Sequence, residues 1–459
     1  MTRFPVRLAA SLLVLSAAGA AVAQPAPAPA AAGAAQIPFE TYKLPNGLNV
    51  ILSRDASVPV VAVNLWYHVG SANEQPGRTG FAHLFEHMMF QGSENVGDDQ
   101  HFKRIQEAGG TLNGSTNPDR TNYYQATPSN FLETLLWLEA DRMGFLLPSM
   151  TEEKLDNQRS VVQNERRQRY ENAPYGLAYE TMSRAMYPEG HPYSWTTIGS
   201  MEDLNAASME DVQSFFRTYY APNNASLAIV GDFDPAEAKR LVEKYFADIP
   251  QGPAIERPSL ASVRLESPKA LILEDRVQLP RLYLAWHSPA QFAEGDAEMD
   301  VLGRVLAGGK NSRLYRRLVY EDQTAQWVSA YQSSRPLGGQ FQITVQAKPG
   351  VNLARVQKAV DEEVARLKTE PPTQRELERA LNNIESQYVQ GVQTVLGKAD
   401  QLNAFYTWTG DPGYGEKAVA RYRTVTPQGV QAAAGRYLDS GRVALSVVPQ
   451  GQTELRASR

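Results

Sequence analysis

The chain repeats itself at long range, and this repeat constrains its fold more than any other feature. The apolar run at residues 58–68 reads like the run at 277–287, which places His68 and His287 219 positions apart. Near the end of each half, residues 211–230 parallel residues 429–448 at an offset of 218, and both read as a helix followed by an apolar strand. Two distant segments that agree to within one residue indicate an internal duplication. We therefore expect two homologous halves.

The halves are predicted to meet at residues 249–268, where prolines and a glycine interrupt all periodicity. In the first half, runs of strands with helices between them predict an α+β fold, with a mainly antiparallel sheet and helices packed on one face. The expected strands form a hairpin over 39–53, a third strand over 58–69 and a pair within 110–127. The expected helices cover 81–90, 128–147, 152–170 and 234–246.

The N-terminus is typical of a secretory signal peptide. Arg3 and Arg7 precede an apolar run over residues 8–22, and Ala21-Val22-Ala23 is an A-x-A-type cleavage site. The run is too short and too rich in Ala and Gly for a comfortable membrane span, although an uncleaved anchor is the alternative. We expect export to the periplasm. The predicted organisation is a signal peptide at 1–23, a Pro/Ala-rich tether at 24–36, an N-terminal domain at 37–250, a linker at 251–268 and a C-terminal homologous domain at 269–455.

Composition excludes several classes of site and partner. The chain has no cysteine, so disulfides are excluded and any metal site must use His, Asp and Glu. The formal net charge is −5 with both signs interspersed, which speaks against binding to nucleic acid.

Residues 83–87, His-Leu-Phe-Glu-His, carry the clearest chemistry in the sequence. A helix turns by roughly 100° per residue, so His83, Glu86 and His87 share an arc of about 100°. Two imidazoles one turn apart can hold one zinc ion, and the carboxylate between them can accept a proton from the attacking water. The alternative is a pair of core histidines satisfied by hydrogen bonds, but the chain has only six histidines in 459 residues.

The second half is expected to lack this site. At the repeat offset of 219, the three motif positions become Leu302, Val305 and Leu306. Aliphatic side chains cannot coordinate a metal, so we expect one metal site, in the first half.

A catalytic zinc usually has three protein ligands and one open position. The helix expected over 152–170 offers Glu165, which lies three and four residues beyond Val162 and Val161 on the apolar face. A carboxylate on an apolar face is an anomaly that a ligand role explains. The alternative is an ion pair with a neighbouring arginine, namely Arg166, Arg167 or Arg169.

The motif at 83–87, with a helical glutamate 78 positions after His87, resembles the pitrilysin/insulinase family of zinc metallopeptidases, the inverzincins. The likeness covers nearly the whole chain after the leader. The other matching segments are Gly109–Thr116, Val161–Arg167, His191–Tyr193, Ile198–Gly199 and Ser312–Leu314. At this length the chain is similar to short bacterial zinc proteases and to mitochondrial processing peptidase subunits.

The resemblance implies a zinc endopeptidase that acts on peptides or small unfolded proteins. His83, His87 and Glu165 would be the ligands of one Zn²⁺ per chain, and Glu86 the general base. An extended substrate would add itself to an edge strand, with the substrate-binding residues Leu112, Asn113, Gly114 and Ser115. One departure is Gln158, where family members often carry a glutamate, so the ligand Glu165 would have a less negative neighbour.

The resemblance also implies that this chain alone is incomplete. Active sites in the family look as if they are finished by an Arg and a Tyr seven positions apart, shortly after a Ser-Arg-Leu stretch. Those positions hold Val319 and Gln326 here, and a shifted register would offer Arg313 and Tyr320. We therefore expect a heterodimer in which a homologous second subunit supplies the Arg/Tyr pair. The alternatives are a self-sufficient homodimer, a non-catalytic core or partner subunit, and a zinc hydrolase that cleaves another kind of bond.

Overall fold

The structure is a computed structural model that describes residues 36–257 and 260–458. The predicted signal peptide and the tether up to residue 35 lie outside the described residues. Contacts join both halves of the described chain into one compact unit. None of its helices combines the length and the apolar character that crossing a membrane would require.

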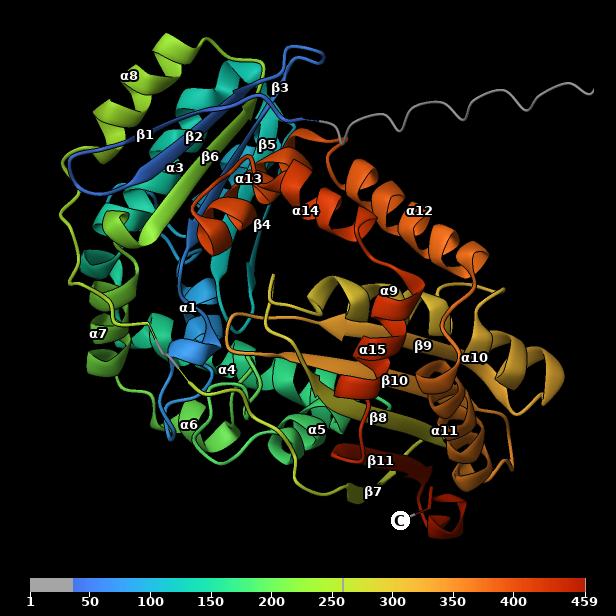
Figure 1. Cartoon of the computed structure of the whole chain (residues 1–459). Helices are drawn as coiled ribbons and strands as arrows, with labels where there is room; N and C mark the ends of the chain where they lie inside the picture. The colour runs from blue at the N-terminus through green and yellow to red at the C-terminus, as the bar shows by residue number, and fades with distance from the viewer. Residues whose placement is uncertain (1–35, 258–259, 459) are drawn as a thin grey trace, which may run out of the picture. The chain divides into compact units, whose positions relative to one another are not determined.

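The first half builds a six-stranded sheet in the order β1-β2-β6-β3-β5-β4 (Figure 1). Only β2 and β6 run parallel, so the sheet is mainly antiparallel, as predicted. Its strands are β1 (Glu40–Lys43), β2 (Asn49–Arg54), β3 (Val60–Tyr67), β4 (Thr111–Thr116), β5 (Thr121–Pro128) and β6 (Ala225–Gly231).

The second half builds a five-stranded sheet in the order β7-β11-β8-β10-β9. Only β7 and β11 are parallel, so the order and the pairing repeat those of β2-β6-β3-β5-β4. Its strands are β7 (Lys269–Asp275), β8 (Arg281–Ser288), β9 (Ala325–Ser333), β10 (Gly339–Ala347) and β11 (Arg442–Pro449). The two homologous halves are therefore confirmed, while the limits of the domains and of the linker remain a prediction.

The helices follow the repeat as well. Those of the first half are α1 (Phe81–Met88), α2 (Gln100–Glu107), α3 (Leu132–Phe145), α4 (Glu152–Arg166), α5 (Ala178–Met186), α6 (Met201–Ala206), α7 (Met209–Tyr219) and α8 (Pro235–Phe246). Those of the second half are α9 (Asp296–Ala307), α10 (Arg313–Tyr315), α11 (Leu353–Thr369), α12 (Gln374–Gly391), α13 (Val395–Thr409), α14 (Gly415–Arg423) and α15 (Pro427–Tyr437). The helix predicted over 152–170 changes after Arg166 into a π-helical turn, η4 (Arg167–Glu171).

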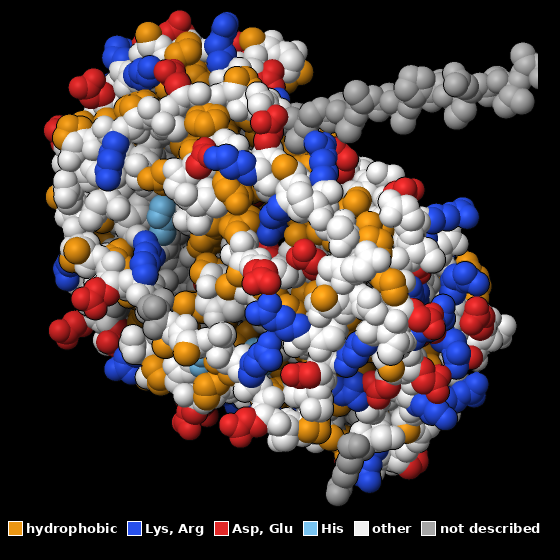
Figure 2. All heavy atoms as spheres, in the orientation of Figure 1, with side chains coloured by type: hydrophobic (Ala, Val, Ile, Leu, Met, Phe, Trp, Pro, Cys, Tyr) orange, Lys and Arg blue, Asp and Glu red, His pale blue; other side chains and the backbone are white. Residues whose placement is uncertain are grey.

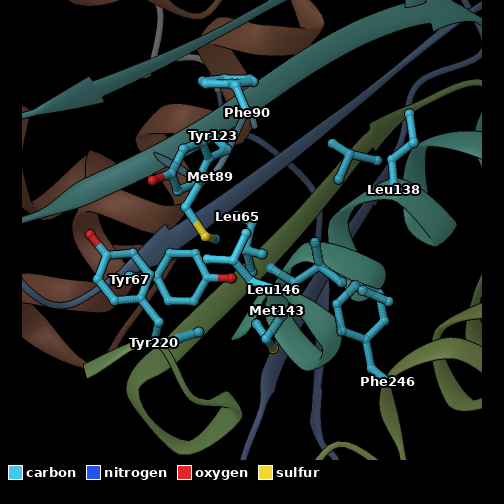
Figure 3. Packing of buried hydrophobic residues seen from close by; sticks show 14 of the residues in the cluster. Leu65, Tyr67, Met89, Phe90, Tyr123, Leu138, Met143, Leu146, Tyr220 and Phe246 are labelled. Carbon is cyan, nitrogen blue, oxygen red and sulfur yellow. The ribbon is translucent and has the colours of Figure 1, made fainter. Parts of the chain in front are cut away.

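Each sheet packs its own helices on one face, as predicted. In the first half, Val61, Val63 and Leu65 of β3 point into a core shared with α1, α3 and α7. Figure 3 shows part of this core, where the rings of Tyr67, Tyr123 and Tyr220 lie beside Leu65. Alternation along the strand therefore sends Ala62, Asn64 and Trp66 to the opposite face.

The opposite faces receive a helix from the other half, which the sequence did not predict. Helix α13 of the second half lies on β3 and β6, where Ala399 and Leu402 pack against Ala62 and Ala228. Helix α5 of the first half lies reciprocally on β8 and β11. The two helices occupy equivalent places in the repeat, so the halves exchange one helix each.

Candidate metal centre

The helix that carries the His-x-x-Glu-His motif, α1, begins at Phe81 after the N-cap residue Gly80, and a buried carboxyl group caps it. Glu74, only 5 % exposed, accepts hydrogen bonds from the backbone N–H of Gly80 at 3.0 Å and of Ala82 at 2.8 Å. The carboxyl oxygens satisfy first-turn N–H groups that have no partner within the helix, while burial raises the pKa of Glu74 well above its usual value. A Cβ at Gly80, whose φ is +90°, would come within 2.8 Å of the carbonyl oxygen of Ile198. The segment Ile198–Gly199 thus packs against the start of α1.

The structure brings the three predicted ligands together. Helix α1 lies against α4, and one donor atom each from His83, His87 and Glu165 lies within 4.8 Å of the others. Glu165 Oε2 is 3.7 Å from His83 Nε2 and 3.4 Å from His87 Nε2. Ligand atoms about 2.1 Å from a tetrahedral zinc lie about 3.4 Å apart, so the spacing and the chemistry of this donor set fit zinc.

The charge states also fit. Burial, followed by the nearby His87, lowers the pKa of His83 to about 4, so its imidazole is neutral, the form that binds metal. The hydrogen bond with His87 outweighs burial and keeps the pKa of Glu165 below its usual value. The alternative for Glu165, an arginine ion pair, is also present, because Oε1 contacts Arg169 Nη1 at 2.6 Å while Oε2 faces the histidines. Arg166 is engaged elsewhere, with Gly199 and Glu180.

The predicted base has a partner that sequence reasoning missed. Thr116 Oγ1 donates a 2.6 Å hydrogen bond to Oε2 of Glu86. Burial raises the pKa of Glu86, and the Thr116 hydroxyl acts in the opposite direction by binding the ionised form. Period-two alternation could have revealed this residue, because it puts Leu112, Gly114 and Thr116 on one face of the strand.

Strand β4 places the four predicted substrate-binding residues at the open end of the sheet order. At the β4–β5 turn, Asn117 N–H donates to Arg120 C=O, and antiparallel pairs alternate between bonded and non-bonded positions. The backbone groups of Asn113 and Ser115 therefore point toward β5, whereas those of Leu112 and Gly114 point to the open edge. Accordingly, the Gly114 N–H donates a hydrogen bond not to β5 but to Oδ1 of Asn113, at 2.9 Å.

Gly114 also brings this strand close to the base. A Cβ placed at Gly114 would lie 3.1 Å from Cγ of Glu86, and helix α1 packs against β4 (Figure 1). The turn that follows β4 is supported by Tyr193, whose hydroxyl donates to Asp119 at 2.7 Å. The segment His191–Tyr193 thus steadies the hairpin that carries the edge strand.

Neither register of the expected Arg/Tyr pair offers an available arginine. Val319 lies in the π-helical segment η6 (Arg316–Glu321), and Gln326 is exposed on β9. In the shifted register, Arg313 is 8 % exposed and its guanidinium binds both carboxylate oxygens of Glu376, at 2.8 and 3.0 Å. Arg313 is thereby committed to holding α12.

The second half has an apolar core where the first has ligands. Leu302, Val305 and Leu306 are fully buried on α9. The surface in Figure 2 carries lysines, arginines and acidic residues interspersed, without a stripe of one sign.

Comparison with known proteins agrees with this division. Residues 49–194 match the family described as Insulinase (Peptidase family M16), and residues 206–384 match the one described as Peptidase M16 inactive domain. The zinc protease PqqE of Helicobacter pylori is 29 % identical over 77 % of this chain and 80 % of its own length. A probable mitochondrial-processing peptidase subunit beta of Arabidopsis thaliana is 22 % identical over 88 % of this chain and 77 % of its own length.

The fold comparison gives the same result. The crystal structure of a protease from Helicobacter pylori matches with a TM-score of 0.85 and 26 % identity, and covers 90 % of this chain and 100 % of that one. The inactive-domain match begins within the first half, at residue 206, and it covers the aliphatic positions Leu302, Val305 and Leu306 but not the His-x-x-Glu-His motif. The chain belongs to the pitrilysin/insulinase family of peptidases, family M16.

Proposed function

We propose that this chain is an exported zinc-dependent endopeptidase that cleaves peptides or small unfolded proteins. One observation carries the proposal: the donor atoms of His83, His87 and Glu165 converge within 4.8 Å, beside the carboxylate of Glu86. The open edge of β4 runs past the same carboxylate. Two imidazoles and a carboxylate next to a second carboxylate are the parts that a hydrolytic metal site requires.

The residues of the chain have distinct parts in the reaction. Zinc, when bound, supplies Lewis-acid polarisation of the scissile carbonyl and makes water more acidic. Glu86 accepts the proton of the attacking water and returns it to the leaving amine. Thr116 holds the Glu86 carboxylate through its 2.6 Å hydrogen bond. The backbone groups of Leu112 and the carbonyl of Gly114, which face the open edge, bind an extended peptide by strand addition, which is indifferent to its side chains.

We further propose that a homologous second subunit completes the site. Donors aimed at the developing oxyanion are worth several kcal/mol, about 3 or more, and the expected positions 319 and 326 hold Val and Gln, neither of which carries a charge or a phenol. The ion pair between Arg313 and Glu376 supports the proposal of a second subunit, because it leaves the arginine of the shifted register unavailable to a substrate. Export to the periplasm is supported by the charged, apolar and small-residue sequence of residues 1–23.

The test is to purify the chain alone, measure its zinc content, and assay a mixed peptide library with and without a homologue that carries the Arg/Tyr pair. Cleavage that requires both chains supports the heterodimer. Full activity of the isolated chain would establish a self-sufficient homodimer or monomer and refute the split site. A zinc-loaded pair that cleaves no peptide would favour a core subunit, or a hydrolase for another bond, which a panel of ester and amide substrates would reveal.

A further inference from the structure

A chain of buried amide hydrogen bonds connects the exchanged helix α13 to the edge strand β4. Asn403 Nδ2 of α13 donates to the backbone oxygen of Asn64 at 2.8 Å. Asn122 Nδ2 of β5 donates to Asn64 Oδ1 at 3.1 Å, and Ser115 Oγ of β4 donates to Asn122 Oδ1 at 2.7 Å. The three asparagines are at most 1 % exposed.

Arg120, in the turn after β4, closes this chain. Its Nη1 donates to the backbone oxygen of Ser115 at 2.8 Å and to Ser115 Oγ at 2.6 Å. Its guanidinium lies 5.0 Å above the ring of Trp66, and this ring makes a T-shaped contact with Trp408 of α13 at a centroid distance of 6.4 Å. Ser115 is therefore held by β5, by Arg120 and, through Asn122 and Asn64, by α13.

The second sheet has a different arrangement at the equivalent place. Asn122 pairs with Trp66, two residues before His68, and Gln342 pairs with Ala285, two residues before His287. Gln342 is thus the counterpart of Asn122. It donates to Thr344 of its own strand at 2.9 Å, so the described side chains do not extend this path to the edge strand β9. The connected path belongs to the half that holds the metal-ligand cluster.

Buried amides make a costly way to join a helix to a sheet, because each polar group must find a partner. These amides hold Ser115, which lies between the two residues that face the base. A Cβ built at Gly114 would lie 3.1 Å from Glu86 Cγ, and Thr116 donates a hydrogen bond to Glu86. An edge strand has a neighbouring strand on one side only, so its position depends on such additional contacts.

We propose that the second half of the chain sets the position of the substrate strand through α13, with Asn403, Asn122 and Arg120 as positioning residues. The position of β4 sets the distance between a peptide bound along that strand and the Glu86 carboxylate and metal ligands. Displacement of about 1 Å can cost up to about a hundredfold in rate, so the anchoring of Ser115 acts on catalysis without touching the substrate. This inference rests on the proposed peptidase function for its kinetic consequence, but not for its structural one.

The structural test is hydrogen exchange of the Asn113 and Ser115 backbone amides, which point toward β5. The variants are Asn403→Leu, which removes the donor of α13, and Arg120→Met, which keeps the stem above Trp66. The milder Ser115→Ala serves if either variant fails to fold. The matched control is Lys398→Met, because Lys398 joins the same helix to Asp55 directly after β2, and three strands separate β2 from β4. We expect exchange at both amides to rise about tenfold or more in the test variants and to stay unchanged in the control.

The kinetic test uses the zinc-loaded enzyme with its Arg/Tyr-bearing partner. Asn403→Leu and Arg120→Met should lower kcat/KM about tenfold at unchanged zinc content, with Arg120→Lys recovering part of the loss. Faster exchange in the test variants, together with a wild-type protein that cleaves no peptide, would support the anchoring and refute the peptidase proposal separately. Unchanged exchange at both amides in folded test variants would overturn the inference.

Discussion

Replacing Thr116 by valine should impair turnover while leaving the metal in place. Valine has the shape and the strand preference of threonine but cannot donate the 2.6 Å hydrogen bond to Glu86 Oε2. A hydrogen bond to a charged group contributes about 1.5–3 kcal/mol, and the partial exposure of both side chains places this one near the lower end. At about 1.4 kcal/mol per factor of ten, kcat/KM should fall about tenfold to thirtyfold.

The assay is steady-state cleavage of a peptide that the wild-type enzyme is found to accept, with zinc content and thermal midpoint measured on the same samples. Thr116→Ser is the matched control, because it keeps the hydroxyl and should retain most of the activity. The loss should appear in kcat more than in KM, since the carboxylate acts in the transition state. Wild-type kcat/KM in zinc-loaded Thr116→Val, or an equal loss in both variants, would show that this hydrogen bond does not orient the base.

Three further predictions concern the base, the third ligand and a partly buried ion pair. Glu86→Gln keeps the shape of the side chain and removes the proton acceptor, so kcat should fall at least a hundredfold at unchanged zinc content. Glu165→Gln should lower zinc occupancy by tenfold or more at limiting zinc, whereas Glu152→Gln at the start of α4 should not; equal zinc in both variants would refute the ligand assignment. Burial raises the pKa of Glu376, but hydrogen bonds from Arg313 and Thr373 outweigh it and hold the pKa at about 2. Because this pKa is depressed, the stabilisation is present above the unfolded value of 4.5 and is lost as the pH falls toward about 2. Denaturant unfolding of Glu376→Gln should therefore show a deficit of about 2–3 kcal/mol at pH 7 that shrinks below about pH 4.5; a deficit independent of pH would contradict the assignment.

Much of the fold could be predicted because its signals are local or repeated. The apolar run over residues 58–69 and the turn at residues 45–47 predict strands that the structure contains. The offset of 219 predicts that the second half has a core leucine, Leu302, at the position of the ligand His83. Helix boundaries were less exact. The helix expected from residue 128 begins at Leu132, because residues 129–131 form a short 3-10 turn after Pro128.

The sequence by itself determined the two histidines and the base, since helical periodicity puts His83, Glu86 and His87 on one face whatever surrounds them. It also determined the duplication. Only the tertiary structure decided that Glu165 meets the histidines, that Thr116 binds Glu86 and that α13 covers the first sheet. The physical reason is that a side-chain pattern tells which face of an element is buried, but not which partner buries it. Strand β3 is buried on both faces, so its continuous apolar run does not distinguish a helix of its own half from one contributed by the other.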